Sequence, residues 1–100
     1  MTRPAAVPTV QIDNERMRVT EWRFAPGAAT GFHRHDYDYC VVPLATGRLG
    51  IETSDKTMIE AQLKMGVSYA RKAGVEHDVI NVNPFEFAFI EVELKEKPRG

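Results

Sequence analysis

The sequence predicts an all-β domain, and three observations support that fold class. Runs of β-branched and aromatic residues recur along the whole chain. Turn signals made of Gly, Pro, Asn and Asp separate these runs at intervals of about 8–12 residues. No stretch has the 3.6-residue apolar period of a convincing amphipathic helix. Together these features are typical of a β-sandwich or β-barrel, and 100 residues correspond to one domain.

The first half of the chain predicts a loose arm followed by four strands. Residues 1–9 contain two prolines and read as the arm, which ends in a short strand at Val10–Ile12. Between Val19 and Trp22 the apolar pattern changes phase, which indicates either a bulge or a strand covered on both faces. Pro43 places its strand at a sheet edge or marks a strand end. The expected strands are residues 16–25, 30–35, 39–44 and 48–53.

The second half predicts four more strands. Residues 57–63 fit a strand or one helical turn, and we favour the strand. In the last and longest strand, alternation puts Glu91 and Glu93 on the solvent face. The opposite face of that strand carries Ala88, Ile90, Val92 and Leu94. The expected strands are residues 57–63, 67–71, 75–82 and 85–95, so the core spans about 16–95 of a single domain covering 1–100.

Composition excludes several classes of partner. The net charge of −1 does not suggest a nucleic-acid surface or an anionic-membrane binder. No apolar run approaches the roughly 18 residues of a membrane-spanning helix, and the first residues lack a secretory signal. Cys40 is the only cysteine, which excludes an internal disulfide. We therefore expect a cytoplasmic protein that binds a small molecule, and a homodimer, because a barrel this small gains from burying an outer face.

The three histidines are the most informative residues of the chain. His33 and His35 are two positions apart in a predicted strand, so their rings point to the same face. His77 lies in a distant predicted strand and can supply a third imidazole. Three imidazole nitrogens bind borderline divalent metals such as Fe, Zn, Ni or Mn and leave coordination positions open. The pattern predicts a metal site at His33, His35 and His77.

Around these histidines the sequence resembles the cupin superfamily. Gly27 precedes five residues and then His33-Arg34-His35, and Gly47 ends this first motif. Gly66, Lys72-Ala73-Gly74, His77 and Asn81 follow at the spacing of the second motif. The resemblance implies a jelly-roll barrel, or double-stranded β-helix, with a metal ion held by the three histidines.

The sequence departs from the family pattern at the expected fourth ligand, where cupins carry a glutamate. Counting back from Gly47 places Cys40 there, and the shorter spacing from His35 places Tyr39 there. Asp38 is the nearby carboxylate, so Asp38 and Cys40 both stay candidates for a fourth ligand. A cysteine beside three histidines also resembles the Fe(II) thiol dioxygenases. In that family a tyrosine follows the third histidine, and this chain has none after Tyr69.

The resemblance implies a metal-dependent enzyme acting on a small organic molecule, with dioxygenase, isomerase or lyase chemistry all open. Non-catalytic binding of a metal or small ligand is the alternative. Arg71 is a candidate for holding a substrate carboxylate if it faces inward. Asn81 fits either substrate contact or hydrogen bonds that order its strand. The candidate pocket residues are Tyr39, Tyr69, Arg71 and Asn81.

Overall fold

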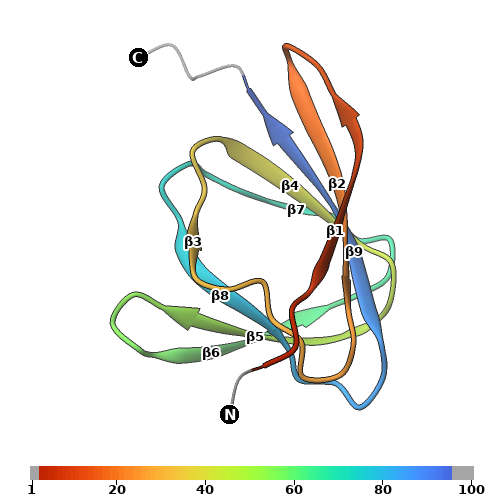
Figure 1. Cartoon of the computed structure of the whole chain (residues 1–100), viewed down its shortest axis with the longest axis vertical. Helices are drawn as coiled ribbons and strands as arrows, with labels where there is room; N and C mark the ends of the chain where they lie inside the picture. The colour runs from red at the N-terminus through yellow and green to blue at the C-terminus, as the bar shows by residue number, and fades with distance from the viewer. Residues whose placement is uncertain (1–2, 96–100) are drawn as a thin grey trace.

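The computed structural model describes residues 3–95, which form nine strands and no helix in two antiparallel sheets. Figure 1 shows the sheets facing each other. Within these residues no helix is long and apolar enough to cross a membrane. One sheet has the order β1 (Val7–Asp13), β2 (Met17–Phe24), β9 (Phe87–Leu94), β4 (Asp38–Pro43) and β7 (Tyr69–Arg71). The other has the order β3 (His33–Arg34), β8 (Glu76–Asn81), β5 (Gly47–Thr53) and β6 (Met58–Leu63).

The all-β prediction is confirmed, and most differences from the predicted strands lie at their ends. Residues 57–63 form a strand, as favoured, and Pro43 is the last residue of β4. The strand predicted at 30–35 is reduced to His33–Arg34. The reason lies in Gly31, whose φ of 85° takes the backbone out of the extended conformation just before the histidines.

The N-terminal segment differs from the prediction of a loose arm over residues 1–9. Residues 1–2 lie outside the described residues, but β1 begins at Val7 and pairs along β2. Before it, the Ala6 amide donates to the Ala29 carbonyl at 2.9 Å, and the Ala29 amide donates to Pro4 at the same distance. Prolines are tolerated here because β1 is an edge strand, which needs only one row of backbone hydrogen bonds.

The phase change in the second predicted strand has a structural counterpart on the neighbouring strand. β2 pairs regularly with β9 from Met17 to Phe24. The register shift lies in β1 between Val10 and Ile12, opposite Thr20 and Val19. Both Val19 and Thr20 are buried although they point to opposite faces of the sheet. The predicted alternative of a strand covered on both faces therefore describes β2 at this point.

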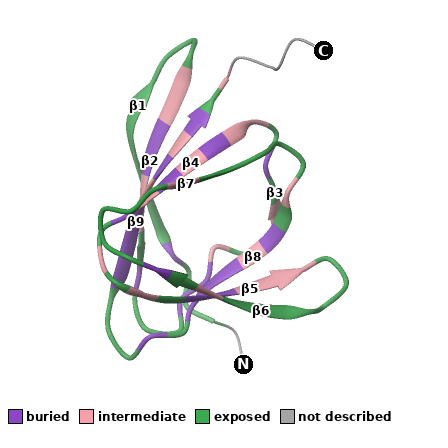
Figure 2. Ribbon diagram, turned by 180° about the vertical axis from the view of Figure 1, so that it is seen from behind, coloured by how far each residue is buried: buried purple, intermediate pink, exposed green. Residues whose placement is uncertain are grey.

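The core lies between the two sheets. β2 and β9 contribute Phe24, Phe87 and Phe89, and the facing sheet contributes Leu49 and Val79. In Figure 2 the buried segments follow the central strands, whereas β1 is exposed throughout. Paired residues of neighbouring strands share a face, so the register places Glu91 in one inner row with Thr20, Val41 and Tyr69. The next inner row contains Arg18, Glu93, Tyr39 and Arg71.

The prediction that Glu91 and Glu93 face solvent is wrong. Glu91 is 7% exposed and Glu93 9% exposed. The two phenylalanines of β9 are both buried in the core, and alternation from them carries the glutamates inward. The outer face of β9 therefore carries Ala88, Ile90, Val92 and Leu94. Their apolar side chains had led the sequence analysis to place the glutamates on the solvent face instead.

Candidate metal centre

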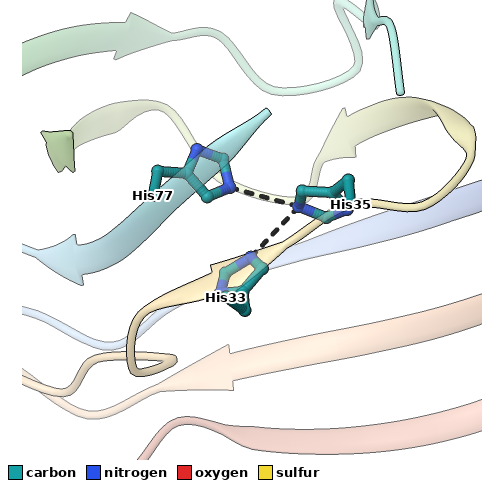
Figure 3. Close-up of side chains that lie close together, drawn as sticks. All are labelled: His33, His35 and His77. Atoms are coloured by element: carbon teal, nitrogen blue, oxygen red, sulfur yellow. Dashed lines mark hydrogen bonds between the residues drawn. The ribbon is translucent and has the colours of Figure 1, made fainter. Parts of the chain in front are cut away.

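The strand register brings the three histidines together. His33 of β3 is directly paired with His77 of β8. His35 follows β3, and its backbone is held on both sides: its amide donates to Val75 and its carbonyl accepts from Gly74, at 2.9 and 2.8 Å. Figure 3 shows the three rings converging, with dashed lines joining His35 to each of the other two. The three predicted ligands therefore come from two remote segments of the chain and meet at one point.

The distances between the ring nitrogens match those of ligands on a shared ion. The Nε2 atom of His35 lies 3.0 Å from that of His33 and 3.1 Å from that of His77. Two nitrogens at right angles, each about 2.1 Å from one metal, lie about 3.0 Å apart, and at the tetrahedral angle they lie about 3.4 Å apart. Both separations lie close to these values, so the residues fit a divalent metal ion.

Hydrogen bonding favours an inward lone pair on at least one ring. His33 Nδ1 donates to the Gly31 carbonyl at 2.8 Å, which fixes the proton on that nitrogen. Its Nε2 then presents a lone pair to His35. A single Nε2 proton on His35 would have to be shared between two neighbouring nitrogens, and a neutral ring nitrogen cannot both donate and accept. One cation can accept all three lone pairs.

Burial keeps the rings in the form that binds metal. Desolvation, followed by the charge of His33, lowers the pKa of His35 to about 4. Desolvation also lowers the pKa of His77 to about 4, with further contributions from His33 and His35. Both imidazoles are therefore neutral near pH 7, and a metal ion does not compete with a bound proton there.

Tyr39 and two carboxylates of the five-stranded sheet lie close to His35. The Tyr39 ring stacks on His35, with ring centroids 3.9 Å apart. Ligand atoms of His35, Glu91 and Glu93 lie within 4.8 Å of one another. Sequence reasoning missed both glutamates; the available signal was the alternation of Phe87 and Phe89 with them, because large aromatic residues mark a core face.

The two carboxylates differ in their partners. Glu93 accepts two hydrogen bonds from the Arg18 guanidinium, at 3.0 and 3.2 Å. No such cation pairs with Glu91 among residues 3–95. Desolvation, together with the charge of Glu93, raises the pKa of Glu91 to about 7, and a hydrogen bond from Trp22 and the charge of Arg18 partly oppose that shift.

A cavity of about 240 Å³ opens beside the triad. Three of the four predicted pocket residues line it, namely Tyr39, Tyr69 and Arg71, and the Arg71 guanidinium lies 4.8 Å above the Tyr69 ring. His77 belongs to the wall and connects the cavity to the metal ligands. The remaining lining residues are Val41, Leu49, Ile51, Ile59, Ala61, Val75, Val79, Phe89 and Glu91. The wall is thus mainly apolar, with a few polar groups.

Three other predicted residues lie apart from this cavity. Asp38 and Cys40 alternate with buried Tyr39, so they point to the outer face of β4, and Asp38 accepts from the Ala73 amide at 2.8 Å. Neither contributes to the clusters of possible metal ligands in the described residues. Asn81 is 1% exposed, and its side-chain amide donates to the carbonyls of Phe24, Ala25 and Phe85. Of the two readings of Asn81, the contacts match structural hydrogen bonding.

Comparison with known proteins supports the class that the fold and triad define. A crystal structure of a cupin domain from Bordetella pertussis is 58% identical, with a TM-score of 0.92 over 96% of this chain and 99% of that one. A double-stranded β-helix protein from Klebsiella pneumoniae has a TM-score of 0.70 over 97% of this chain and 90% of that one, at 20% identity, and shows the fold alone. No family model matches the chain.

The chain belongs to the cupin superfamily, as the fold, the histidine spacing and the Bordetella structure indicate. Within that superfamily it is also similar to the beta-alanine degradation protein BauB of Pseudomonas aeruginosa. The two are 58% identical over 93 residues, which cover 93% of this chain and 97% of BauB.

Proposed function

We propose that the protein is a metal-dependent enzyme that acts on a small carboxylate-bearing molecule. The convergence of three buried or half-buried imidazoles beside a mainly apolar cavity carries this proposal. A divalent metal at such a site supplies Lewis-acid or redox chemistry and open positions for a substrate oxygen. His33, His35 and His77 would hold the ion.

The donor set is compatible with several divalent metals. Three neutral imidazoles with open coordination positions suit Fe(II), Ni(II), Mn(II) and Zn(II). Elemental analysis of the purified protein distinguishes these metals.

Arg71 supports a substrate that bears a carboxylate. Among residues 3–95 it is the only Arg or Lys lining the cavity, and no carboxylate in this part of the chain pairs with it. A guanidinium binds a carboxylate through two parallel hydrogen bonds. The name of BauB, which refers to degradation of the amino acid β-alanine, agrees with a small organic acid as the substrate class.

The test combines metal analysis with a substrate screen. Protein purified without a histidine tag should retain about one of these metals per chain, and the loaded protein should turn over a member of a panel of small organic acids. Arg71→Met should raise KM for that acid while leaving metal content unchanged, and Arg16→Met, at an exposed arginine outside the cavity, is the control. A metal-loaded protein that is silent across the panel would favour the alternative of a non-catalytic binding module.

We also propose that two copies associate through the outer face of the five-stranded sheet. The register places a row of apolar side chains there, and β1, at one edge of the sheet, is exposed along its whole length. A second copy would cover surface that is costly to leave in water. Light scattering should give twice the 11.3 kDa chain mass, and a monomer at micromolar concentration would contradict the proposal. The accessible members of the row are Ile12, Cys40, Val42, Ile90 and Val92.

A further inference from the structure

Glu91 is a buried carboxylate that makes no ion pair within residues 3–95, where a hydrogen bond from Trp22 and the charge of the more distant Arg18 favour its ionised form. It is 7% exposed, lines the cavity together with His77, and has an oxygen within 4.8 Å of a His35 ring nitrogen. Its neighbour Glu93 is matched by Arg18 at 3.0 Å, and the Thr20 and Val41 side chains paired with Glu91 carry no charge. A buried charge without a partner is unfavourable, and such a group is a candidate for a functional role.

When the histidine triad holds a divalent metal, the site carries a positive charge that its three ligands do not neutralise. Three neutral imidazoles leave the full double charge of a divalent ion inside the barrel, where a low dielectric makes such a charge costly. Asp38 and Cys40 both point to the outer face of β4 and cannot reduce that charge at close range. The negative charge of Glu91 and the positive charge of the ion offset each other when both are present.

We propose that Glu91 is the charge-balancing carboxylate of the metal centre, supplied by the last strand. The inference rests on the proposed metal site and goes beyond it by assigning a carboxylate that no histidine motif contains. Glu91 does not contact the substrate in this proposal; its negative charge lowers the free energy of the bound ion. The charge of Glu93 is already paired with Arg18, so it contributes less to this balance.

The test compares Glu91→Gln with the exposed control Glu60→Gln, which removes the same formal charge. Co(II) affinity is measured by chelator competition at about pH 8, and thermal unfolding is followed with and without Co(II). Loss of an outer partner of a metal site typically weakens binding by about 10–100-fold. We expect a weakening of that size in Glu91→Gln and none in Glu60→Gln.

The metal-free protein distinguishes charge balance from a structural role. Without metal, Glu91→Gln should unfold at the same or a higher temperature than the wild type, because an uncompensated buried charge is gone. A lower metal-free unfolding temperature with unchanged Co(II) affinity would overturn the proposal. If Glu91→Gln does not fold, Glu91→Met provides the same comparison, and equal affinity in that variant would likewise refute it. Failure of the wild type to bind any metal would instead overturn the proposed function.

Discussion

Replacement of Glu91 by Gln should change how the stability of the metal-free protein depends on pH. Burial raises the pKa of this carboxyl from 4.5 to about 7. Below the pKa of the unfolded chain, the Glu91 carboxyl is protonated in both the folded and the unfolded state, so it does not affect stability. Between the two values the unfolded chain releases a proton that the folded chain keeps, so stability falls as pH rises.

The size of this effect follows from the pKa shift. A rise from 4.5 to about 7 corresponds to about 3 kcal/mol at about 1.4 kcal/mol per unit. The wild type should lose that amount between about pH 4.5 and pH 7, and Glu91→Gln should not. The difference in unfolding free energy between the two proteins should therefore grow from near zero to as much as about 3 kcal/mol in favour of the variant.

Urea denaturation at a series of pH values measures this difference directly. His35 and His77 have lowered pKa values, so they contribute stability that is lost as pH falls from 6.5 toward 4. That contribution is present in both proteins and cancels to first order. Glu60→Gln controls for the loss of one charge. A difference that stays constant across the pH range, or a variant less stable than wild type at about pH 8, would refute the reasoning.

Three further substitutions or modifications test the fold and the site. His77→Ala should abolish stoichiometric metal in elemental analysis while far-UV circular dichroism keeps its β signature; retained metal would contradict the assignment of the ligand. Gly47→Ala should lower the unfolding free energy in urea by about 1–3 kcal/mol, because its Cβ would lie 2.7 Å from Asn83 Oδ1; unchanged stability would show that Asn83 moves at no cost. Cys40 should react with a thiol reagent at the same rate with and without metal, because it faces outward on β4; protection by metal would support it as a ligand.

Sequence patterns predict this fold well because each strand carries its own local signal. β-Branched runs and turn residues located eight of the nine strands near their observed positions, and Asn81 orders a turn through the side-chain bonds that its residue type suggests. The segment before β2 was harder, since its prolines argue against a strand while an edge position tolerates them. Edge or interior position depends on strand order, which the local sequence does not contain.

The candidate site also contains some residues that the sequence identifies and one that it does not. His33, His35 and His77 are identifiable because their spacing on strands is local information, and pairing of β3 with β8 then brings them together. Glu91 is not identifiable in this way, because its direction depends on which face of β9 enters the core. Both faces of that strand carry apolar residues, so composition alone favoured the wrong one.

The register of β9 explains how the fold tolerates a buried carboxylate. A shift by one residue would turn Glu91 outward, but it would also expose Phe87 and Phe89, which are 0% and 4% exposed. Burying two such rings contributes about 3–6 kcal/mol, against a cost of about 3 kcal/mol for the carboxyl. The aromatic core therefore holds Glu91 beside the triad even before a metal binds. A binding site whose carboxyl group is held in place in advance needs little reorganisation when the cation arrives.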